Sequence, residues 1–267
     1  MVLMKRGRRE KGRPVSDSAA RHRVTFDVRS YDVGEDHRLR LVVLNRMLQE
    51  AAWQHARLLG KGFIERAAGG YYWVLARLKL TIEELPTWGD RFAIETRPVG
   101  TDRMFALREF TIVDDADREI GYATSGWLVV DAARRRPVRP QPLVADLQIS
   151  APRYAFPVAK LESPENAAFY GPFPVRLHDI DQYRHVNNTA YLEWMLDCLA
   201  DLRDNPEITA SQEPPVELRM DFLQEAILSD RYTIGVESST DRVRGEVTRV
   251  RDGQTCCRCE LVRTGQG

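Results

Sequence analysis

W-G-D-R-F-A-I, residues Trp88–Ile94, returns 140 positions later as L-S-D-R-Y-T-I, residues Leu228–Ile234. Upstream, the runs Leu78–Ile82 and Leu218–Phe222 are separated by the same 140 positions. Both pairs alternate inward and outward side chains, as β-strands do. A coincidental strand opening would not also fix the spacing of a second strand. The sequence therefore predicts two copies of one unit.

A helix precedes the strands in each copy. Residues Leu44–Leu59 carry apolar side chains at the i, i+3, i+4, i+7 spacing of one buried helical face, and Gly60 and Gly62 end the pattern. In the second copy the same pattern begins after Asn187 or Asn188, either of which can cap the helix. The apolar positions of this second helix are Tyr191, Trp194, Met195, Cys198, Leu199 and Leu202.

Further alternating runs follow the shared motif in each copy: Leu107–Val113, Tyr122–Val130, Arg244–Val250 and Gln254–Val262. One long helix followed by antiparallel strands packs best when a curved sheet wraps around the apolar face of the helix. We therefore predict an α+β fold with two such domains, residues 21–145 and 146–267. The stretch 131–143 holds three prolines and four arginines and is predicted to begin the linker.

The composition fits a globular protein, with 43% apolar and 29% charged residues. Lys plus Arg and Asp plus Glu each number 39, which argues against nucleic acid as the main partner. Residues 1–20 open with a basic stretch that lacks apolar periodicity, so we predict a flexible arm. No run reaches the roughly 18 apolar residues of a membrane helix, so we expect a cytoplasmic protein without membrane insertion.

The four cysteines are compatible with a reducing compartment. Three of them, Cys256, Cys257 and Cys259, lie in one alternating run and lack the C-x-x-C spacing of a zinc site. We expect core or surface thiols there, and neither a metal nor a cofactor.

Polar residues are concentrated at 178–194, H-D-I-D-Q-Y-R-H-V-N-N-T-A-Y-L-E-W, just before the second helix. Setting Leu48 opposite Leu192 aligns the two helices and tests whether the first copy has an equivalent cluster. The first-copy residues that then face Asp181, His185 and Asn187 are His37, Leu41 and Val43. The cluster is therefore predicted to exist in the second copy alone, with Asp179 as a turn or capping residue.

A carboxylate also replaces an apolar residue at the 140-position spacing, where Glu225 falls opposite Leu85. Apolar neighbours partly desolvate such a carboxylate, which makes it a stronger base. Asp181 is close enough along a turn to orient the His185 ring, and the amides after Asn188 offer a site for an oxyanion. This set of groups favours acyl transfer. The alternatives are a surface glutamate and a capping or core histidine.

These motifs resemble the acyl-acyl carrier protein thioesterases. The similar stretches are L-N-R-M-L-Q-E-A-A-W-Q-H-A from Leu44, L-P-T-W-G-D-R from Leu85 and H-V-N-N-T-A-Y-L-E-W from His185. The resemblance covers roughly residues 22–262 and implies two tandem hotdog domains. It also implies hydrolysis of the thioester that joins a fatty acyl chain to acyl carrier protein.

By this resemblance, the catalytic residues are Asp181, His185 and Glu225, and Tyr183, Asn187 and Asn188 contact the substrate. The chain departs from the family pattern at two places. Tyr183 stands where the pattern D-x-N-x-H has asparagine, and Ala226 replaces a cysteine that often follows the glutamate. The missing cysteine argues against a thiol nucleophile. We expect water to attack the thioester, with Glu225 or Asp181 as general base.

The resemblance implies acyl carrier protein as the partner. This protein is acidic, so the basic arm or the arginines after residue 133 are candidates to bind it, although a solvated linker is the alternative. These arginines are Arg134, Arg135, Arg136 and Arg139. An acyl tunnel is expected between helix and sheet, with candidate or plain core residues Trp53, Phe63, Trp73 and Leu75. The oligomeric alternatives are a monomer of two hotdogs and a homodimer. The functional alternatives are an acyl-CoA thioesterase and a silent acyl-binding hotdog protein.

Overall fold

The computed structural model describes residues 20–62, 70–147, 149–156, 159–200, 214–239 and 241–264. Residues 1–19 of the predicted basic arm lie outside the described residues. The tunnel candidate Phe63 and the predicted helix position Leu202 also lie outside them.

One antiparallel sheet runs through both copies of the unit, in the order β1-β3-β4-β5-β2-β8-β11-β10-β9-β7, with β6 paired to β5. The first half contributes β1 (His22–Asp27), β2 (Tyr71–Ile82), β3 (Arg91–Asp102), β4 (Phe105–Asp114), β5 (Glu119–Asp131) and β6 (Arg136–Val138). The second half contributes β7 (Ala168–Pro174), β8 (Val216–Phe222), β9 (Arg231–Ser238), β10 (Arg242–Arg249) and β11 (Gln254–Arg263). Every strand run predicted from the sequence overlaps one of these strands.

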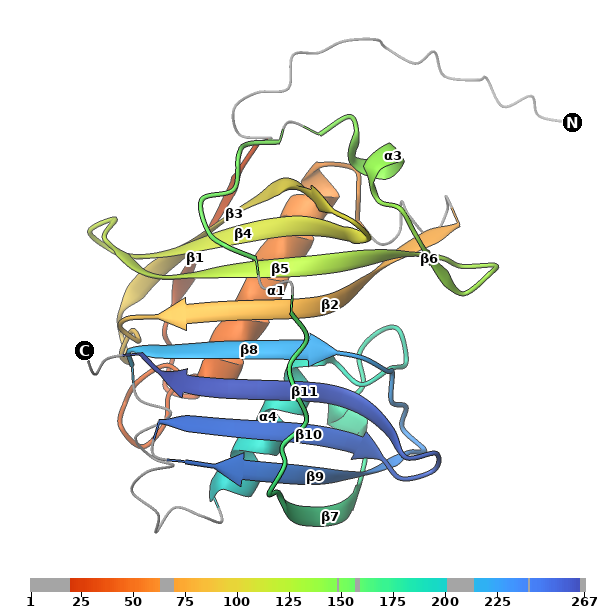
Figure 1. The fold of residues 1–267 in the computed structure, drawn as a ribbon. Helices are drawn as coiled ribbons and strands as arrows, with labels where there is room; N and C mark the ends of the chain where they lie inside the picture. Colours follow the sequence, from red (N-terminus) through yellow and green to blue (C-terminus); the bar gives the residue numbers. More distant parts are fainter. Residues whose placement is uncertain are drawn as a thin grey trace, which may run out of the picture.

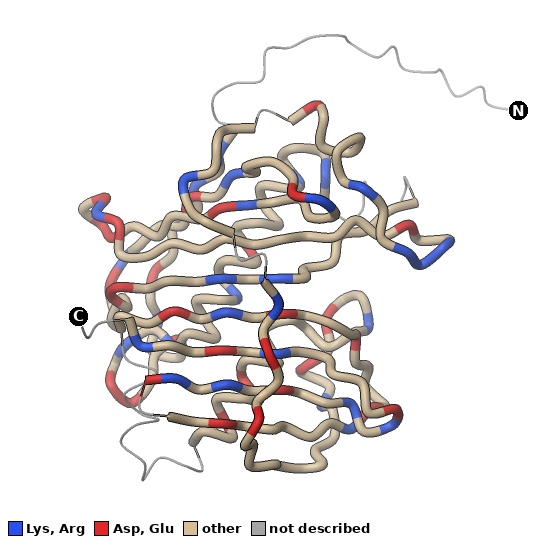
Figure 2. The backbone as a smooth tube through the Cα atoms, viewed as in Figure 1, with Lys and Arg blue, Asp and Glu red and all other residues tan. Residues whose placement is uncertain are grey.

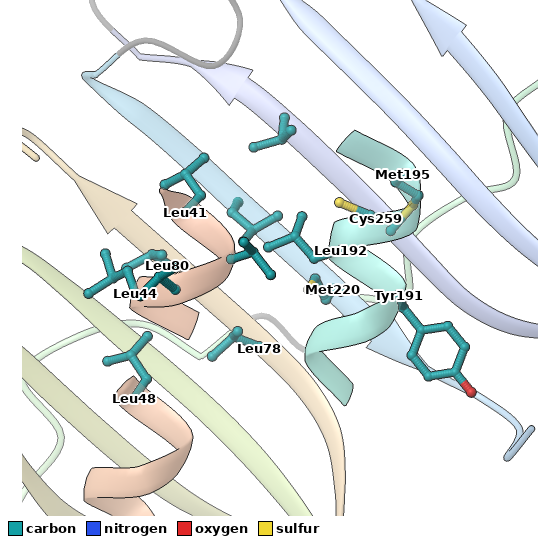
Figure 3. Close-up of a cluster of buried hydrophobic side chains, with 14 of the residues drawn as sticks. Leu41, Leu44, Leu48, Leu78, Leu80, Tyr191, Leu192, Met195, Met220 and Cys259 are labelled. Atoms are coloured by element: carbon teal, nitrogen blue, oxygen red, sulfur yellow. The ribbon is translucent and has the colours of Figure 1, made fainter. Parts of the chain in front are cut away.

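Two helices lie on one face of the sheet, α1 (Leu41–Leu58) against the first half and α4 (Asn188–Ala200) against the second (Figure 1). Leu44 and Leu48 of α1 and Leu192 of α4 are each at most 1% exposed. Figure 3 shows these residues beside side chains of the sheet, and one core cluster includes residues of both halves. The helices predicted from the apolar spacing are therefore confirmed, with α1 beginning three residues earlier than predicted.

The two halves join through strands β2 and β8. Arg77–Ile82 of β2 pair with Val216–Asp221 of β8, and Leu80 faces the fully buried Leu218. Because β2 begins at Tyr71, its first residues extend beyond the end of β8. The start of β2 therefore lies next to the loop that follows β8. The division into domains at residues 145 and 146 stays a prediction.

The connection between the halves crosses the other face of the sheet, opposite the helices (Figures 1 and 2). Carboxylates of the sheet bind the backbone of this connection. Glu109 Oε1 accepts hydrogen bonds from the amides of Arg153 (2.7 Å) and Tyr154 (2.8 Å), and Asp221 accepts one from the amide of Leu161 (2.8 Å). The prediction that the linker begins at 131–143 is wrong, because this stretch forms β6 and a short helix, α3 (Gln141–Val144). Arg136, Pro137 and Val138 of β6 pair with Asp131, Val130 and Val129 at the end of β5.

Candidate active site

A tight hairpin leads into α4 and carries two of the predicted catalytic residues. The Asp181 amide donates to the His185 carbonyl (2.9 Å), and the Arg184 amide donates to the Asp181 carbonyl (3.0 Å). Arg184 adopts a left-handed backbone with φ 67°, which lets the chain reverse within these few residues. Asp181 and His185 consequently stand opposite each other at the base of the hairpin.

Asp179 directly precedes this hairpin, which is closed by the pairing of Ile180 with Val186, and it fixes the position of the hairpin through hydrogen bonds. Its side chain is 3% exposed and accepts hydrogen bonds from the Arg176 amide (2.6 Å) and the Trp194 indole (3.2 Å). Its carbonyl accepts the Asn187 amide (2.7 Å). The prediction that Asp179 is a turn or capping residue is confirmed.

Asn187 caps α4, as one of the two predicted alternatives. Its Oδ1 accepts the Thr189 amide and hydroxyl, both at 2.9 Å, and its carbonyl accepts the Ala190 amide at 2.9 Å. These two amides are the first two after Asn188, and both already donate to Asn187. The expectation that the amides after Asn188 hold an oxyanion is therefore wrong for this pair, and the Asn188 amide itself is the remaining candidate at the start of the helix.

His185 and Glu225 come together from segments forty residues apart. His185 Nε2 lies 3.4 Å from Glu225 Oε2, and the two side chains are 34% and 40% exposed. The loop after β8 is fixed to the hairpin because the Val186 amide donates to the Ala226 carbonyl at 2.8 Å. Arg249 also donates to the Glu225 carbonyl. The backbone on either side of the carboxylate is thus held while the side chain reaches solvent.

The Asp181 carboxylate does not orient the imidazole as expected. Its Oδ1 accepts the Tyr183 amide at 2.8 Å, and within the described residues it makes neither a hydrogen bond nor an ion pair with the His185 ring. The two residues are linked through their backbones instead. Asp181 shapes the hairpin, and Glu225 is the carboxylate that faces the imidazole.

Tyr183 lies at the tip of the hairpin and contacts the first half. Its ring stacks on Trp53 of α1, with 6.1 Å between centroids and 13° between planes. Its hydroxyl accepts a hydrogen bond from Gln182 Nε2 at 2.8 Å. Burial, followed by the charge of Asp181, raises the pKa of Tyr183 to about 12, so the phenol stays protonated at neutral pH.

Two residues of the first half that are not among the predicted site residues also reach Glu225. An Arg135 guanidinium nitrogen lies 4.0 Å from Glu225 Oε2. Tyr72 of β2 is close enough that the charge of Glu225, after burial, raises the pKa of its phenol. The sequence predicts Arg135 only as one of several arginines for carrier binding, and no pattern in the sequence distinguishes it from its neighbours.

The register of the two copies differs from the predicted one. Val28 and Val175 make equivalent hydrogen bonds to Asp90 and Asp230, and this pair of valines stands 147 positions apart. The alignment that set His37, Leu41 and Val43 opposite the polar cluster is therefore wrong. At a spacing of 147, the counterparts of Asp181, His185 and Asn187 are Gly34, Arg38 and Arg40.

The comparison with known proteins agrees with the two copies. Residues 19–146 match the family described as Acyl-ACP thioesterase N-terminal domain, and residues 162–247 match the Acyl-ACP thioesterase C-terminal domain. The chain belongs to the acyl-ACP thioesterase family. Its predicted membership and its predicted tandem hotdog fold are both confirmed.

Two curated relatives in this family are plant proteins. The oleoyl-acyl carrier protein thioesterase 1 of Arabidopsis thaliana is 30% identical over 205 residues, which are 69% of this chain and 56% of the relative. The dodecanoyl-[acyl-carrier-protein] hydrolase of Cinnamomum camphora is 27% identical over 239 residues, or 81% of this chain and 60% of the relative. The chain thus spans little more than half the length of these relatives.

Among solved structures, the 12:0-ACP thioesterase of Umbellularia californica has a TM-score of 0.78 and 21% identity, with 91% of this chain and 96% of that one covered. This likeness concerns the fold. No helix among the described residues of this acyl-ACP thioesterase family member is long and apolar enough to cross a membrane.

The cysteines of this family member lie in the core. Cys198, Cys256, Cys257 and Cys259 are buried and form no disulfide, and burial raises the pKa of Cys256 to about 11. The described residues hold no group of three His, Cys, Asp or Glu side chains that could bind a metal ion. Leu75 is buried, and the Trp73 indole donates to the Lys61 carbonyl at 2.9 Å. Whether an acyl chain passes these residues stays a prediction.

Proposed function

We propose that this chain is a thioesterase that hydrolyses the fatty acyl thioester of acyl carrier protein and releases a free fatty acid. The observation that carries the proposal is the approach of His185 Nε2 to Glu225 Oε2, 3.4 Å apart at a half-exposed position beside the start of α4. Membership of the acyl-ACP thioesterase family supports the reaction and the carrier. The names of the plant relatives support fatty acid synthesis as its setting.

In the proposed mechanism, Glu225 takes a proton from a water molecule whose oxygen attacks the thioester carbonyl carbon. His185 faces the same carboxylate oxygen and holds the water or the carbonyl in place. The amide of Asn188, at the start of α4, stabilises the negative charge that develops on the carbonyl oxygen. The carbon–sulfur bond then breaks and the thiolate accepts the proton. A strong general acid is not needed because a thiol has a pKa of only about 8.5.

Glu225 is the better of the two expected bases. Asp181 Oδ1 accepts the Tyr183 amide, so this carboxylate is already engaged within the hairpin. The Glu225 carboxylate has the imidazole as its nearest polar neighbour, and it is accessible to water. Asp181 contributes by shaping the hairpin that presents His185.

The test is a hydrolysis assay of the full chain on acyl-acyl carrier proteins of medium and long chain length, with the matching acyl-CoA esters in parallel. We expect faster turnover of the carrier-protein thioesters. Glu225→Gln and His185→Ala should each lose hydrolysis while the unfolding transition is kept. Asp181→Asn should retain most of the activity, because the asparagine Oδ1 can still accept the Tyr183 amide. Near wild-type turnover in both Glu225→Gln and His185→Ala would contradict the assignment of the site.

Two other outcomes would select an alternative function. Faster turnover of CoA esters would make the chain an acyl-CoA thioesterase. Acyl-carrier binding without turnover by the wild-type chain would make it a silent binding protein, and Tyr183 at the asparagine position of the family pattern is the feature that favours this outcome. The expected cytoplasmic location and the oligomeric state stay predictions.

A further inference from the structure

The turn between β5 and β6 aims one arginine of the first half at the second half. Asp131 Oδ1 accepts the amides of Ala133 and Arg134, both at 2.9 Å, and the Asp131 carbonyl accepts the Arg135 amide at 2.8 Å. Arg135 has φ 53°, a left-handed conformation that residues other than glycine rarely adopt. The turn is thus fixed by its own hydrogen bonds, and it sets the direction in which Arg135 leaves the backbone.

The ends of several strands place this turn beside the candidate site. β5 and β8 end on the same side of the sheet, and the start of β2 lies between them (Figure 1). Arg135 and Tyr72 come from the first half, and His185 and Glu225 from the second. Figure 2 shows the basic turn between β5 and β6 projecting at this edge of the sheet.

Glu225 Oε2 is approached by side chains from both halves. It lies 3.4 Å from His185 Nε2 and 4.0 Å from the Arg135 guanidinium. We propose that Arg135 is a positioning residue of the hydrolytic site, which holds the Glu225 carboxylate against His185 so that the first half completes the site of the second. The inference rests on the proposed function and deepens it.

The physical argument is one of conformational freedom. The Glu225 side chain is 40% exposed, so packing alone leaves it several rotamers. The Arg135 side chain is 76% exposed, and an ion pair between groups this exposed adds little to the stability of the fold. Selection of the one rotamer that faces His185 instead raises the rate, because the base is already placed when water arrives.

Neighbouring arginines provide matched controls. Arg134 and Arg136 flank Arg135 in sequence and are also exposed, and among the described residues neither forms an ion pair. They remain candidates for binding an acidic carrier protein. A role in carrier binding acts on carrier-protein substrates alone, whereas positioning of Glu225 acts on every thioester.

The experiment compares Arg135→Gln with Arg134→Gln and Arg136→Gln in the full chain, on acyl-carrier-protein and acyl-CoA substrates. We expect Arg135→Gln to lower kcat about two- to fivefold on both substrates with KM within about twofold, and Arg135→Lys to recover part of the loss. The two control variants can raise KM for the carrier protein, but neither should reproduce the fall in kcat that Arg135→Gln shows on both substrates. Unchanged kcat in Arg135→Gln, or an effect confined to KM for the carrier protein, would overturn the proposal.

A second variant separates positioning from folding. Arg135→Gly relieves the left-handed conformation, so its unfolding temperature should equal or exceed that of the wild type while kcat still falls. A loss of kcat that follows a loss of stability would assign Arg135 a structural role instead.

A third measurement does not depend on turnover. The NMR signals of the His185 ring should shift in Arg135→Gln and stay in place in Arg134→Gln. If the wild-type chain hydrolyses neither thioester but the ring signals shift, the proposed function fails and the positioning contact stands. If they do not shift, the contact itself is refuted.

Discussion

The two halves of the molecule build the same hairpin before their helices with different side chains. In the first half the Gly34 amide donates to the Arg38 carbonyl at 2.9 Å, as the Asp181 amide does to His185 in the second. His37 and Arg184, 147 positions apart, both adopt the left-handed conformation, with φ 62° and 67°. The backbone conformation of this hairpin therefore does not depend on the candidate catalytic side chains. The second half differs in placing a carboxylate and an imidazole, Asp181 and His185, at the two positions where the first half has Gly34 and Arg38.

Carboxylates that occur in both halves have structural roles. Asp32 accepts the Arg29 amide at 3.0 Å, as Asp179 accepts the Arg176 amide. Asp90 and Asp230 each accept an amide three residues earlier, at 2.7 and 2.9 Å. Asp181 and Glu225 occur only in the second half, where the first has Gly34 and Leu85. Comparison of the halves thus separates the carboxylates that the fold requires from those available for catalysis.

An exchange at one pair of equivalent positions should give the largest effect. Glu225→Leu installs the first-half residue and removes the proposed base, so kcat should fall about 10²- to 10⁴-fold with little change in unfolding free energy. Leu85→Glu places a carboxylate at a site that is 8% exposed and should cost about 3 kcal/mol or more. Thioester hydrolysis and urea unfolding measure the two effects. Similar losses of stability in both variants would refute the division of roles.

The capping carboxylates should differ in a graded way. Asp179→Ala leaves the Arg176 amide and the buried Trp194 indole without an acceptor, so we expect a loss of about 3 kcal/mol. Asp32→Ala removes the hydrogen bond from the Arg29 amide and should cost about 2 kcal/mol. Urea unfolding of both variants provides the comparison. A larger loss for Asp32→Ala would show that the indole contact contributes nothing.

Much of the fold could be predicted from periodicity, because alternating strands and a 140-position spacing are visible without contacts. The register of the polar cluster could not. An α-helix has 3.6 residues per turn, so a shift of three residues leaves an apolar face nearly in place, and the spacings 144 and 147 fit the helices about equally well. Only the hydrogen bonds of the hairpins distinguish the two.

The candidate site was predictable to a similar degree. Polar residues without a counterpart in the first half pointed to His185 and Glu225, and the structure brings these two together. Arg135 could not be singled out, because three consecutive arginines are chemically identical until a turn gives each a direction. The contact between Tyr183 and Trp53 likewise depends on how the halves dock.

That docking contact gives a third, smaller effect. Tyr183→Asn restores the residue of the family pattern but removes the stacking on Trp53, so it should lower the unfolding free energy by about 1.5 kcal/mol. Tyr183→Phe keeps the ring and should be nearly neutral. Trp53→Ala in the Tyr183→Asn background tests the coupling, since a fully additive loss would contradict a direct contact. A strong gain of turnover in Tyr183→Asn from an inactive parent would identify the natural chain as a silent binding protein.

Alkaline pH should weaken the second half in particular, because all four cysteines of the chain lie there. Cys256 is 1% exposed, and burial raises the pKa of its thiol to about 11. In the unfolded chain the thiol ionises near pH 8.5 to 9, so the unfolded state releases this proton first and the stability falls as the pH rises from about 9 toward 11. Cys256→Ala removes this contribution, and its unfolding free energy should fall about 1 kcal/mol less than that of the wild type between pH 8 and 10. Urea unfolding of the two proteins at each pH measures this difference. An identical pH dependence of the unfolding free energy would show that the Cys256 thiol reaches water in the folded state.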